Sequence, residues 1–170
     1  GNNISDMYLS YWSDPDLGDA TDDFIGCDTL LNLGYTYNAN EYDNNYGSPP
    51  PSIGYNLLCG PIVPAASNLY GLKNGKWRKG YKNLDMTSFN YSYNGNDLNY
   101  GDPIKSVYEG TIQTYNLQKG LDRNGNQITN PATGQITKYC FPGDPVIASG
   151  WTEQTHRWPG DKRHYISMGP

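Results

Sequence analysis

Glycine, asparagine and tyrosine recur along the whole chain and divide it into short segments. The sequence has 20 Gly, 19 Asn and 16 Tyr among 170 residues. Glycine and asparagine favour tight turns, and tyrosine is enriched in strands, where its ring packs and its hydroxyl stays solvated. The chain is polar, with a mean hydropathy of -0.75, but only 17% of its residues are charged. Such polarity without charge indicates a folded domain of short strands rather than a disordered chain.

We predict a single mainly β domain over residues 1–170, because this length suits one domain and no segment has the composition of a linker. Strand-forming runs cover residues 4–12, 30–37, 53–58, 84–93 and 164–168. Trp77 is expected in the loop before the fourth run. A β-sandwich-like domain with long loops is the expected architecture, although a barrel is also compatible with these runs. The last strand stops at Gly169-Pro170, so we interpret the chain as a fragment of a longer one.

One α-helix is predicted at about residues 103–119. Asp102 suits the N-cap, and Pro103 suits the first helical position. Lys119-Gly120 gives a basic last turn and a C-terminal glycine. Between these ends, apolar residues recur at helical spacing: Ile104, Val107, Tyr108, Ile112 and Tyr115.

The densest chemistry is an acidic loop between residues 14 and 28. It holds six of the chain's 17 acids: Asp14, Asp16, Asp19, Asp22, Asp23 and Asp28. Alternating carboxylates around a glycine turn suit calcium, which takes six to eight oxygen ligands at about 2.3–2.6 Å. We predict a calcium site here, with Asp14, Asp16 and Asp19 as the leading ligands. The spacing is not that of an EF-hand, and the alternative is a solvated loop whose aspartates cap turns.

The charge balance excludes two classes of partner. The net charge is -5 and the isoelectric point is near 4.8, and the longest basic cluster is residues 76–79. We therefore expect no binding to nucleic acid or to an anionic membrane. No run approaches the roughly 20 apolar residues of a membrane helix, so membrane insertion is not expected.

The chain contains no recognisable catalytic motif. His156 and His164 stand outside any known motif, and signatures of nucleophilic, zinc-hydrolase and phosphoryl-transfer enzymes are missing. A glycosidase needs only two carboxylates at a set separation, which leaves no reliable trace in a sequence. Glu153 beside Trp151 and Trp158 is the best candidate for a sugar-facing acid. The same rings would suit a non-catalytic carbohydrate-binding face, although aromatic residues in small β domains more often form the core.

Three cysteines, Cys27, Cys59 and Cys140, match no zinc-binding pattern. They allow one disulfide in three pairings, or three buried thiols. Candidate glycosylation sites are Asn3 and Asn90, each in an Asn-x-Ser sequon. Thr29 lies in Asp28-Thr29-Leu30, which is similar to a short O-glycosylation motif of some secreted bacterial proteins.

Several motifs occur in order along nearly the whole chain. The most specific is WSDPDLGD at 12–19, followed by DDFIGCD at 22–28. Shorter pieces follow at 50–55, 60–61, 86–89, 130–134, 143–146, 150–151 and 160–163. Together they resemble a region of large secreted bacterial surface proteins that are exported by the type IX secretion system.

This resemblance implies an extracellular or cell-surface setting, and a module followed by further β segments and a C-terminal sorting domain. It implies no activity and no catalytic residues. Cys27 falls within the matching motif, whereas Cys59 and Cys140 depart from the family pattern, so the resemblance favours a Cys59–Cys140 disulfide.

These observations predict a non-catalytic, calcium-stabilised module for adhesion, surface structure or assembly. Strands at both ends of the chain would suit strand sharing with copies of itself or with other domains of the parent chain. The alternative function is a carbohydrate-binding or glycoside-cleaving domain, with glycans as partners and with Trp151, Trp158 and Glu153 as its contacts.

Overall fold

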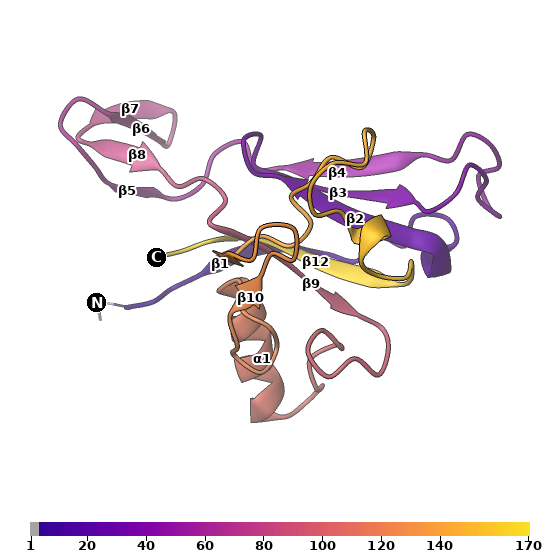
Figure 1. Ribbon diagram of the computed structural model, residues 1–170. Helices are drawn as coiled ribbons and strands as arrows, with labels where there is room; N and C mark the ends of the chain where they lie inside the picture. The colour runs from indigo at the N-terminus through magenta and orange to yellow at the C-terminus, as the bar shows by residue number, and fades with distance from the viewer. Residues whose placement is uncertain (1–3) are drawn as a thin grey trace.

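The computed structural model describes residues 4–170 and shows a mainly β protein, which confirms the predicted fold class (Figure 1). The strands are β1 (Leu9–Ser13), β2 (Asp23–Asp28), β3 (Leu33–Asn38), β4 (Ser52–Asn56), β5 (Ile62–Pro64), β6 (Tyr70–Lys73), β7 (Lys76–Lys79), β8 (Tyr81–Asn83), β9 (Ser88–Tyr93), β10 (Ile128–Thr129), β11 (Ile136–Thr137) and β12 (Lys162–Met168). The helical elements are α1 (Tyr108–Gln118) and two 3-10 turns, η1 (Ala20–Asp22) and η2 (Glu153–Thr155). Within the described residues, no helix has the length and apolar character needed to cross a membrane.

Two three-stranded antiparallel sheets pack against each other, as in a small sandwich. Their strand orders are β1-β12-β9 and β2-β3-β4. Gly34 of β3 faces Phe89 of β9 and Ile166 of β12, and a Cβ on Gly34 would lie 2.6 Å from the Phe89 ring. Glycine is therefore required where the sheets come this close. The core between them consists of Ile25, Cys27, Met86, Phe89, Tyr91, Ile128, Cys140, Phe141, Trp151 and Ile166.

The segment from residue 138 to residue 160 covers the outer edges of β9 and β2. On β9, Phe89 exchanges backbone hydrogen bonds with Lys138 and Cys140. On β2, alternate residues point their backbone groups away from β3, and each of these residues has a partner. The bonds run from Cys27 N–H to Phe141 O (3.2 Å), from Gly160 N–H to Asp23 O (3.0 Å) and from Ile25 N–H to the Glu153 carboxylate (2.7 Å). Both edges are therefore closed to a further strand.

β1 and β4 form the two remaining edges of the sandwich, and they lie on the same side of it. Tyr11 of β1 and Tyr55 of β4 are in contact, with ring centroids 5.4 Å apart. No described residue makes a backbone hydrogen bond to the outward side of either strand. The sandwich thus has one closed side and one open side.

The helix begins later than predicted and buries different residues. α1 starts at Tyr108 instead of residue 103, because Asp102 does not cap it but accepts a hydrogen bond from the Ser92 hydroxyl (2.6 Å). The buried positions of α1 are Gly110, Gln113 and Leu117. The apolar residues expected at helical spacing are mostly exposed: Ile104, Val107, Tyr108 and Ile112. The end of the helix matches the prediction, with Lys119 as C-cap and Gly120 at a φ of 74°.

Residues 60–84 fold into an arm that projects from one end of the sandwich (Figure 1). The arm pairs β5 with β8 and β6 with β7. Asn74 and Gly75 join β6 to β7 with positive φ angles of 52° and 72°, as a type I′ hairpin turn requires. Trp77 lies on β7, so its predicted placement in a loop is wrong. Only Gly71 is buried in this segment, so the arm has almost no core of its own.

The remaining strand predictions are correct in type but shifted in their bounds. β1, β3, β4, β9 and β12 overlap the five predicted runs. β2 lies within the stretch predicted to be an acidic loop, because Phe24, Ile25 and Cys27 are buried in the sandwich. The acidic residues in this stretch therefore favoured the prediction of a loop where the structure has the core strand β2.

Candidate functional site

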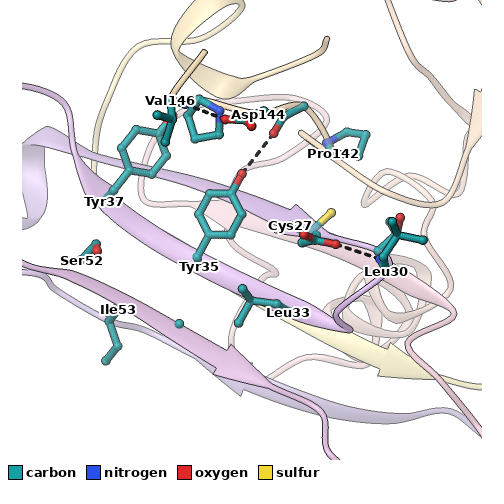
Figure 2. A pocket seen from close by; sticks show the side chains of 15 residues that line it. Cys27, Leu30, Leu33, Tyr35, Tyr37, Ser52, Ile53, Pro142, Asp144 and Val146 are labelled. Carbon is teal, nitrogen blue, oxygen red and sulfur yellow. Dashed lines mark hydrogen bonds between the residues drawn. The ribbon is translucent and has the colours of Figure 1, made fainter. Parts of the chain in front are cut away.

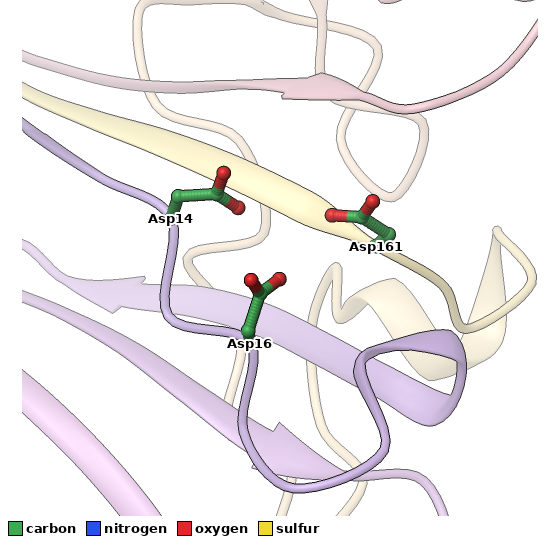
Figure 3. A group of neighbouring side chains, drawn as sticks. All are labelled: Asp14, Asp16 and Asp161. Atoms are coloured by element: carbon green, nitrogen blue, oxygen red, sulfur yellow. The ribbon is translucent and has the colours of Figure 1, made fainter.

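The structure brings together two of the six predicted calcium ligands. Carboxylate oxygens of Asp14, Asp16 and Asp161 lie within 4.8 Å of one another (Figure 3). Asp14 directly follows β1 and Asp161 directly precedes β12, and the pairing of Ser13 with His164 places both at the same end of the sheet. Asp161 lies outside the acidic loop to which the sequence assigned the ligands, and no local signal marks it as a neighbour of Asp14.

Arg163 is the cation that faces this cluster. Its Nε donates to Asp14 Oδ2 (3.1 Å), and its Nη1 lies 2.7 Å from Asp161 Oδ1 and 3.5 Å from Asp102 Oδ2. The pKa of Asp14 is raised above its ordinary value, mainly because the carboxyl is partly buried. The charge of Arg163 lowers this pKa, whereas the charges of Asp16 and Asp161 raise it. Asp14 Oδ1 is buried without a hydrogen-bond partner among the described residues. An oxygen-only set with uncompensated negative charge fits a hard cation such as calcium.

Three of the other predicted ligands accept local hydrogen bonds instead, and two of them cap turns. Asp19 is the N-cap of η1 and accepts from the backbone N–H (3.1 Å) and the hydroxyl (2.6 Å) of Thr21. Asp22 accepts hydrogen bonds from the side chains of Asn38, at the end of β3, and Asn40, in the loop that follows. Asp28 accepts from the backbone N–H groups two and three residues further on. For Asp19 and Asp28 the structure shows the capping role that the sequence left open as the alternative.

Asp23 is a buried strand residue and does not join the cluster. It is 2% exposed, and its Oδ2 accepts the Leu17 N–H (2.9 Å). Burial raises the pKa of Asp23 to about 7, the hydrogen bond from Leu17 lowers it, and the charge of Asp22 raises it further. The carboxyl is therefore partly protonated at neutral pH.

Asp43, which the sequence did not single out, ties the two acidic loops together. It is fully buried, and its Oδ2 accepts the Asp19 N–H (2.8 Å). Its Oδ1 accepts the backbone N–H groups of Asn45 and Tyr46. The loop after β3 is thus held against the loop before β2.

A groove of about 760 Å³ lies on the outer face of the β2-β3-β4 sheet (Figure 2). Tyr35 and Tyr37 of β3 form its floor, and the segment 142–146 forms the facing wall. The Tyr35 hydroxyl donates to the Gly143 carbonyl (3.2 Å) and links floor to wall. Ser52 and Gly54 line the groove beside the open edge of β4. Tyrosine rings next to free strand groups suit an extended peptide rather than a chemical reaction.

Two of the three predicted sugar contacts are buried, so this prediction is wrong for them. Trp151 is 7% exposed and belongs to the core. Glu153 is fully buried, with Oε1 2.9 Å from Lys162 Nζ and Oε2 accepting the Ile25 N–H (2.7 Å). Burial raises the pKa of Glu153, while Lys162 lowers it. The carboxylate closes the edge of β2 and has no access to a sugar.

Trp158 differs from these two, because it is 88% exposed. It borders a hollow of about 230 Å³ that is also lined by Tyr93, Arg157 and Lys162. An exposed ring beside cationic groups retains the properties of a sugar or anion contact.

Neither histidine forms a catalytic arrangement. His164 is fully buried between the Tyr55 and Phe89 rings, and neither of its ring nitrogens has a hydrogen-bond partner in the described chain. Burial lowers the pKa of His164 to about 4, so it is neutral and inaccessible at neutral pH. His156 is exposed, and its Nδ1 contacts the Thr155 hydroxyl at 2.6 Å.

All three cysteines, each within the described residues, are free thiols, so the predicted Cys59–Cys140 disulfide is not formed. Cys59 is exposed beside the arm, whereas Cys140 is completely buried in the core. Cys27 lies against Cys140 and donates from Sγ to its carbonyl (3.4 Å). Burial raises the pKa of both Cys27 and Cys140. These two thiols act as small core side chains, as the sequence allowed.

The fold also bears on the predicted glycosylation sites. Asn3 lies outside the described residues. Asn90 is fully buried, and its Nδ2 donates to the carbonyls of Leu117 (3.1 Å) and Leu121 (2.6 Å), so the folded protein does not offer it to a glycan. Thr29 is exposed and stays a prediction.

Comparison with known proteins gives no further guidance, since no family model, no curated protein and no solved structure matches the chain. The functional argument therefore depends on the geometry described above. The resemblance to surface proteins of the type IX secretion system stays a prediction.

Proposed function

We propose that this chain is a non-catalytic extracellular or cell-surface module that assembles with copies of itself or with neighbouring domains of a longer chain. The observation that carries the proposal is the pair of open strand edges on one side of the sandwich. Open edges present unpaired N–H and C=O groups and recruit strands from other chains. The sequence resemblance and the uncharged, tyrosine-rich composition support the extracellular setting.

On β4, alternate residues direct their backbone groups to the open side. The Leu57 N–H donates to Asn32 O (2.9 Å), so every second residue back from Leu57 also faces β3. Ser52, Gly54 and Asn56 therefore face outward, and all three are exposed. A strand added here would run along the tyrosine-floored groove and place alternate side chains in it.

The same reasoning applies to β1. The Thr87 N–H donates to Ser167 O (2.8 Å), so Ser167 faces β9 and Ile166 faces β1. Ser10 and Trp12 then direct their backbone groups outward. On the closed side of the sandwich, each outward-facing residue of β2 has a hydrogen-bond partner for one of its backbone groups, so the contrast between the two sides supports a binding role for the open one.

A matched pair of substitutions at Gly54 tests this role. Both Gly54→Pro and Gly54→Ala add a Cβ that would lie 3.0 Å from Leu33 Cδ1, but only proline removes the outward N–H. We expect concentration-dependent oligomers in sedimentation velocity for the natural chain and the alanine variant. The proline variant should associate about tenfold more weakly, which corresponds to about 1.4 kcal/mol.

Hydrogen exchange provides the second measurement for this test. The amides of Ser52, Gly54 and Asn56 should exchange freely at low concentration and slow down as the chain associates. A chain that stays monomeric at all concentrations, with edge amides that never become protected, would contradict assembly through these edges. Urea unfolding of both variants separates loss of association from loss of fold.

We further propose that calcium binds at Asp14, Asp16 and Asp161 and stabilises the module. The support is the charge balance, since among residues 4–170 only Arg163 forms ion pairs with this cluster, and it also pairs with Asp102. An added cation would hold the loop before β2 against the start of β12. It would raise the free energy of unfolding by about 2.7 kcal/mol at a hundredfold excess over Kd.

Asp16→Asn is the clean variant for the calcium test. Asp16 is exposed, makes no ion pair with a described residue, and has a φ of 38°, which asparagine tolerates. After chelation, calcium should raise the melting temperature of the natural chain and of the control Glu41→Gln by several degrees, but not that of Asp16→Asn. If calcium stabilised all three proteins equally, or none of them, the proposal that calcium binds at Asp14, Asp16 and Asp161 would be wrong.

A second candidate function is carbohydrate binding around Trp158, which is favoured by the exposure of this ring beside Arg157. Binding to a glycan array that Trp158→Ala abolishes would support it. Silence of the natural chain on the same array would remove it. Cleavage of glycosides is not proposed, because Glu153 is sealed in the core.

A further inference from the structure

The cations of this chain are concentrated on the arm. Residues 60–84 contain five of the chain's 12 Lys and Arg and none of its 17 acids. These five are all exposed: Lys73, Lys76, Arg78, Lys79 and Lys82. The rest of the chain then carries seven cations against 17 acids. A net charge of -5 therefore conceals a positive arm on a strongly negative body.

The arm has neither a counter-charge nor a core of its own. Lys73 and Lys76 are directly opposite on β6 and β7, and like charges in that position destabilise a strand pair. No described acid forms an ion pair with any of the five cations. Trp77 and Tyr70 of the same hairpin are 69% and 55% exposed. Exposed aromatic rings among cations are typical of a surface that has a partner.

The unpaired acids lie at the opposite end of the sandwich. The arm departs after Asn56, which pairs with Leu33, and returns to the start of β9. The other end of the same sheet is marked by the pair Asp23 and Asn38. The loops 13–23 and 38–47 extend from that end, so they lie across the sandwich from the arm (Figure 1).

These two loops are acidic and contain no basic residue, although Arg163 of β12 pairs with Asp14 and the side chains of Asp23 and Asp43 are buried. They hold seven acids, and no Lys or Arg occurs in the chain before Lys73. Asp16, Asp19, Asp22 and Glu41 are at least partly exposed, and none of them forms an ion pair within the described chain. The acidic loops therefore complement the arm in charge.

We propose that the arm of one copy docks on the acidic loops of a second copy, head to tail. The two complementary surfaces are built into one chain but lie at opposite ends of it, so they meet only between copies. A contact of this kind is heterologous and repeats into a ring or a filament. Trp77 and Tyr70 would form the apolar centre of the contact, and the surrounding charges would steer and orient it.

This inference rests on the proposed assembly role and names one contact for it. The arm contact differs physically from strand addition at β1 and β4. Attraction between exposed charges falls steeply at about 1 M salt, where the Debye length is about 3 Å, whereas backbone pairing is much less sensitive. Salt dependence therefore separates the two modes of association.

Sedimentation velocity in the presence of chelator, at low ionic strength and at about 1 M salt, measures the contact. The natural chain should associate more strongly at low salt than at about 1 M salt, where only association through the strand edges persists. Lys76→Glu with Lys79→Glu should abolish the salt-sensitive part of this association. Lys105→Glu with Lys138→Glu changes the net charge equally at exposed sites outside the arm and should leave it intact.

A charge exchange identifies the surface on which the arm docks. Glu41→Lys with Asn45→Lys makes the acidic loops less negative at two exposed positions, and this variant should also lose the salt-sensitive association. Mixed with the arm variant, it should restore association, because its basic arm meets the unchanged acidic loops of the other protein. Restoration by mixing cannot come from unfolding of either variant.

Three results would overturn the proposal: a natural chain whose association does not depend on salt, an arm variant that keeps the salt-sensitive association, or a mixture that does not regain it. Binding of the arm to heparin, without self-association, would assign it to a polyanion instead. If Gly54→Pro loses only the association that persists at about 1 M salt and keeps the salt-sensitive contact, the two modes are separate. Failure of the arm contact alone leaves strand addition standing, and the reverse also holds.

Discussion

Replacing Lys162 by methionine should destabilise the fold strongly while keeping the shape of the side chain. Lys162 and Glu153 form an ion pair at 2.9 Å whose side chains are 3% and 0% exposed. Lys162 Nζ also donates to the Trp158 carbonyl (3.0 Å), and Glu153 accepts the Ile25 N–H that would otherwise be an unpaired edge group. Removing the lysine leaves a carboxylate buried without a counter-charge.

The expected loss in the free energy of unfolding is about 3–5 kcal/mol, the usual result when one partner of a buried pair is removed. That is a large part of the 5–15 kcal/mol that stabilises a typical domain. Adding Glu153→Gln to Lys162→Met should recover at least half of the loss, because the amide oxygen still accepts the Ile25 N–H while the buried charge is gone. Lys105→Met, at an exposed lysine, should change stability by less than about 0.5 kcal/mol.

Urea unfolding followed by tryptophan fluorescence measures these differences, and the double-mutant cycle gives the coupling between the two side chains. A loss below about 1 kcal/mol for Lys162→Met would refute the reasoning, since a solvated pair is worth no more than that. A double variant no more stable than the single one would show that packing, and not charge, is responsible.

Three further measurements follow from buried titratable groups. The folded-state pKa of Asp23 is raised to about 7, so stability should fall by up to about 4 kcal/mol as pH rises from about 4 to 7, and Asp23→Asn should abolish this slope in urea unfolding. The pKa of His164 is lowered to about 4, so stability should fall by up to about 3 kcal/mol as pH drops from about 6.5 to 4, and His164→Phe should remove that loss. A thiol reagent should modify Cys59 alone in the native protein, and reach Cys27 and Cys140 only after unfolding, as mass spectrometry would show. If either variant kept the pH dependence of the free energy of unfolding, the pKa shift of the replaced residue would be contradicted. Rapid labelling of a second cysteine in the native protein would contradict the burial of that cysteine.

Local features of the chain were predictable because they depend on residues a few positions apart. The short strands, the end of α1 at Lys119-Gly120 and the capping role of several aspartates all follow from near neighbours. The start of α1 was not predictable, because the Asp102 carboxylate accepts a hydrogen bond from Ser92 of the preceding strand β9 instead of capping the helix. For the same reason, Trp77 could be assigned to a strand and not to a loop only after its partner strand was known.

Residues that carry chemistry were decided by pairings between the two ends of the chain. Asp161 and Arg163 reach Asp14 because β1 pairs with β12, and no local pattern encodes that register. Glu153 and Asn90 are polar residues that look solvent-facing in the sequence, but tertiary partners satisfy their hydrogen bonds and allow their burial.

The sequence by itself determined the class of this protein: a mainly β domain of short strands, acidic overall, without a recognisable catalytic motif. It also determined how the charged residues are distributed along the chain, with no Lys or Arg before Lys73. Only the tertiary structure decided where these charges stand and which strand edges stay open. The physical reason is that composition and turn chemistry are local, whereas burial, register and the separation of arm and acidic loops depend on contacts between segments far apart in the chain.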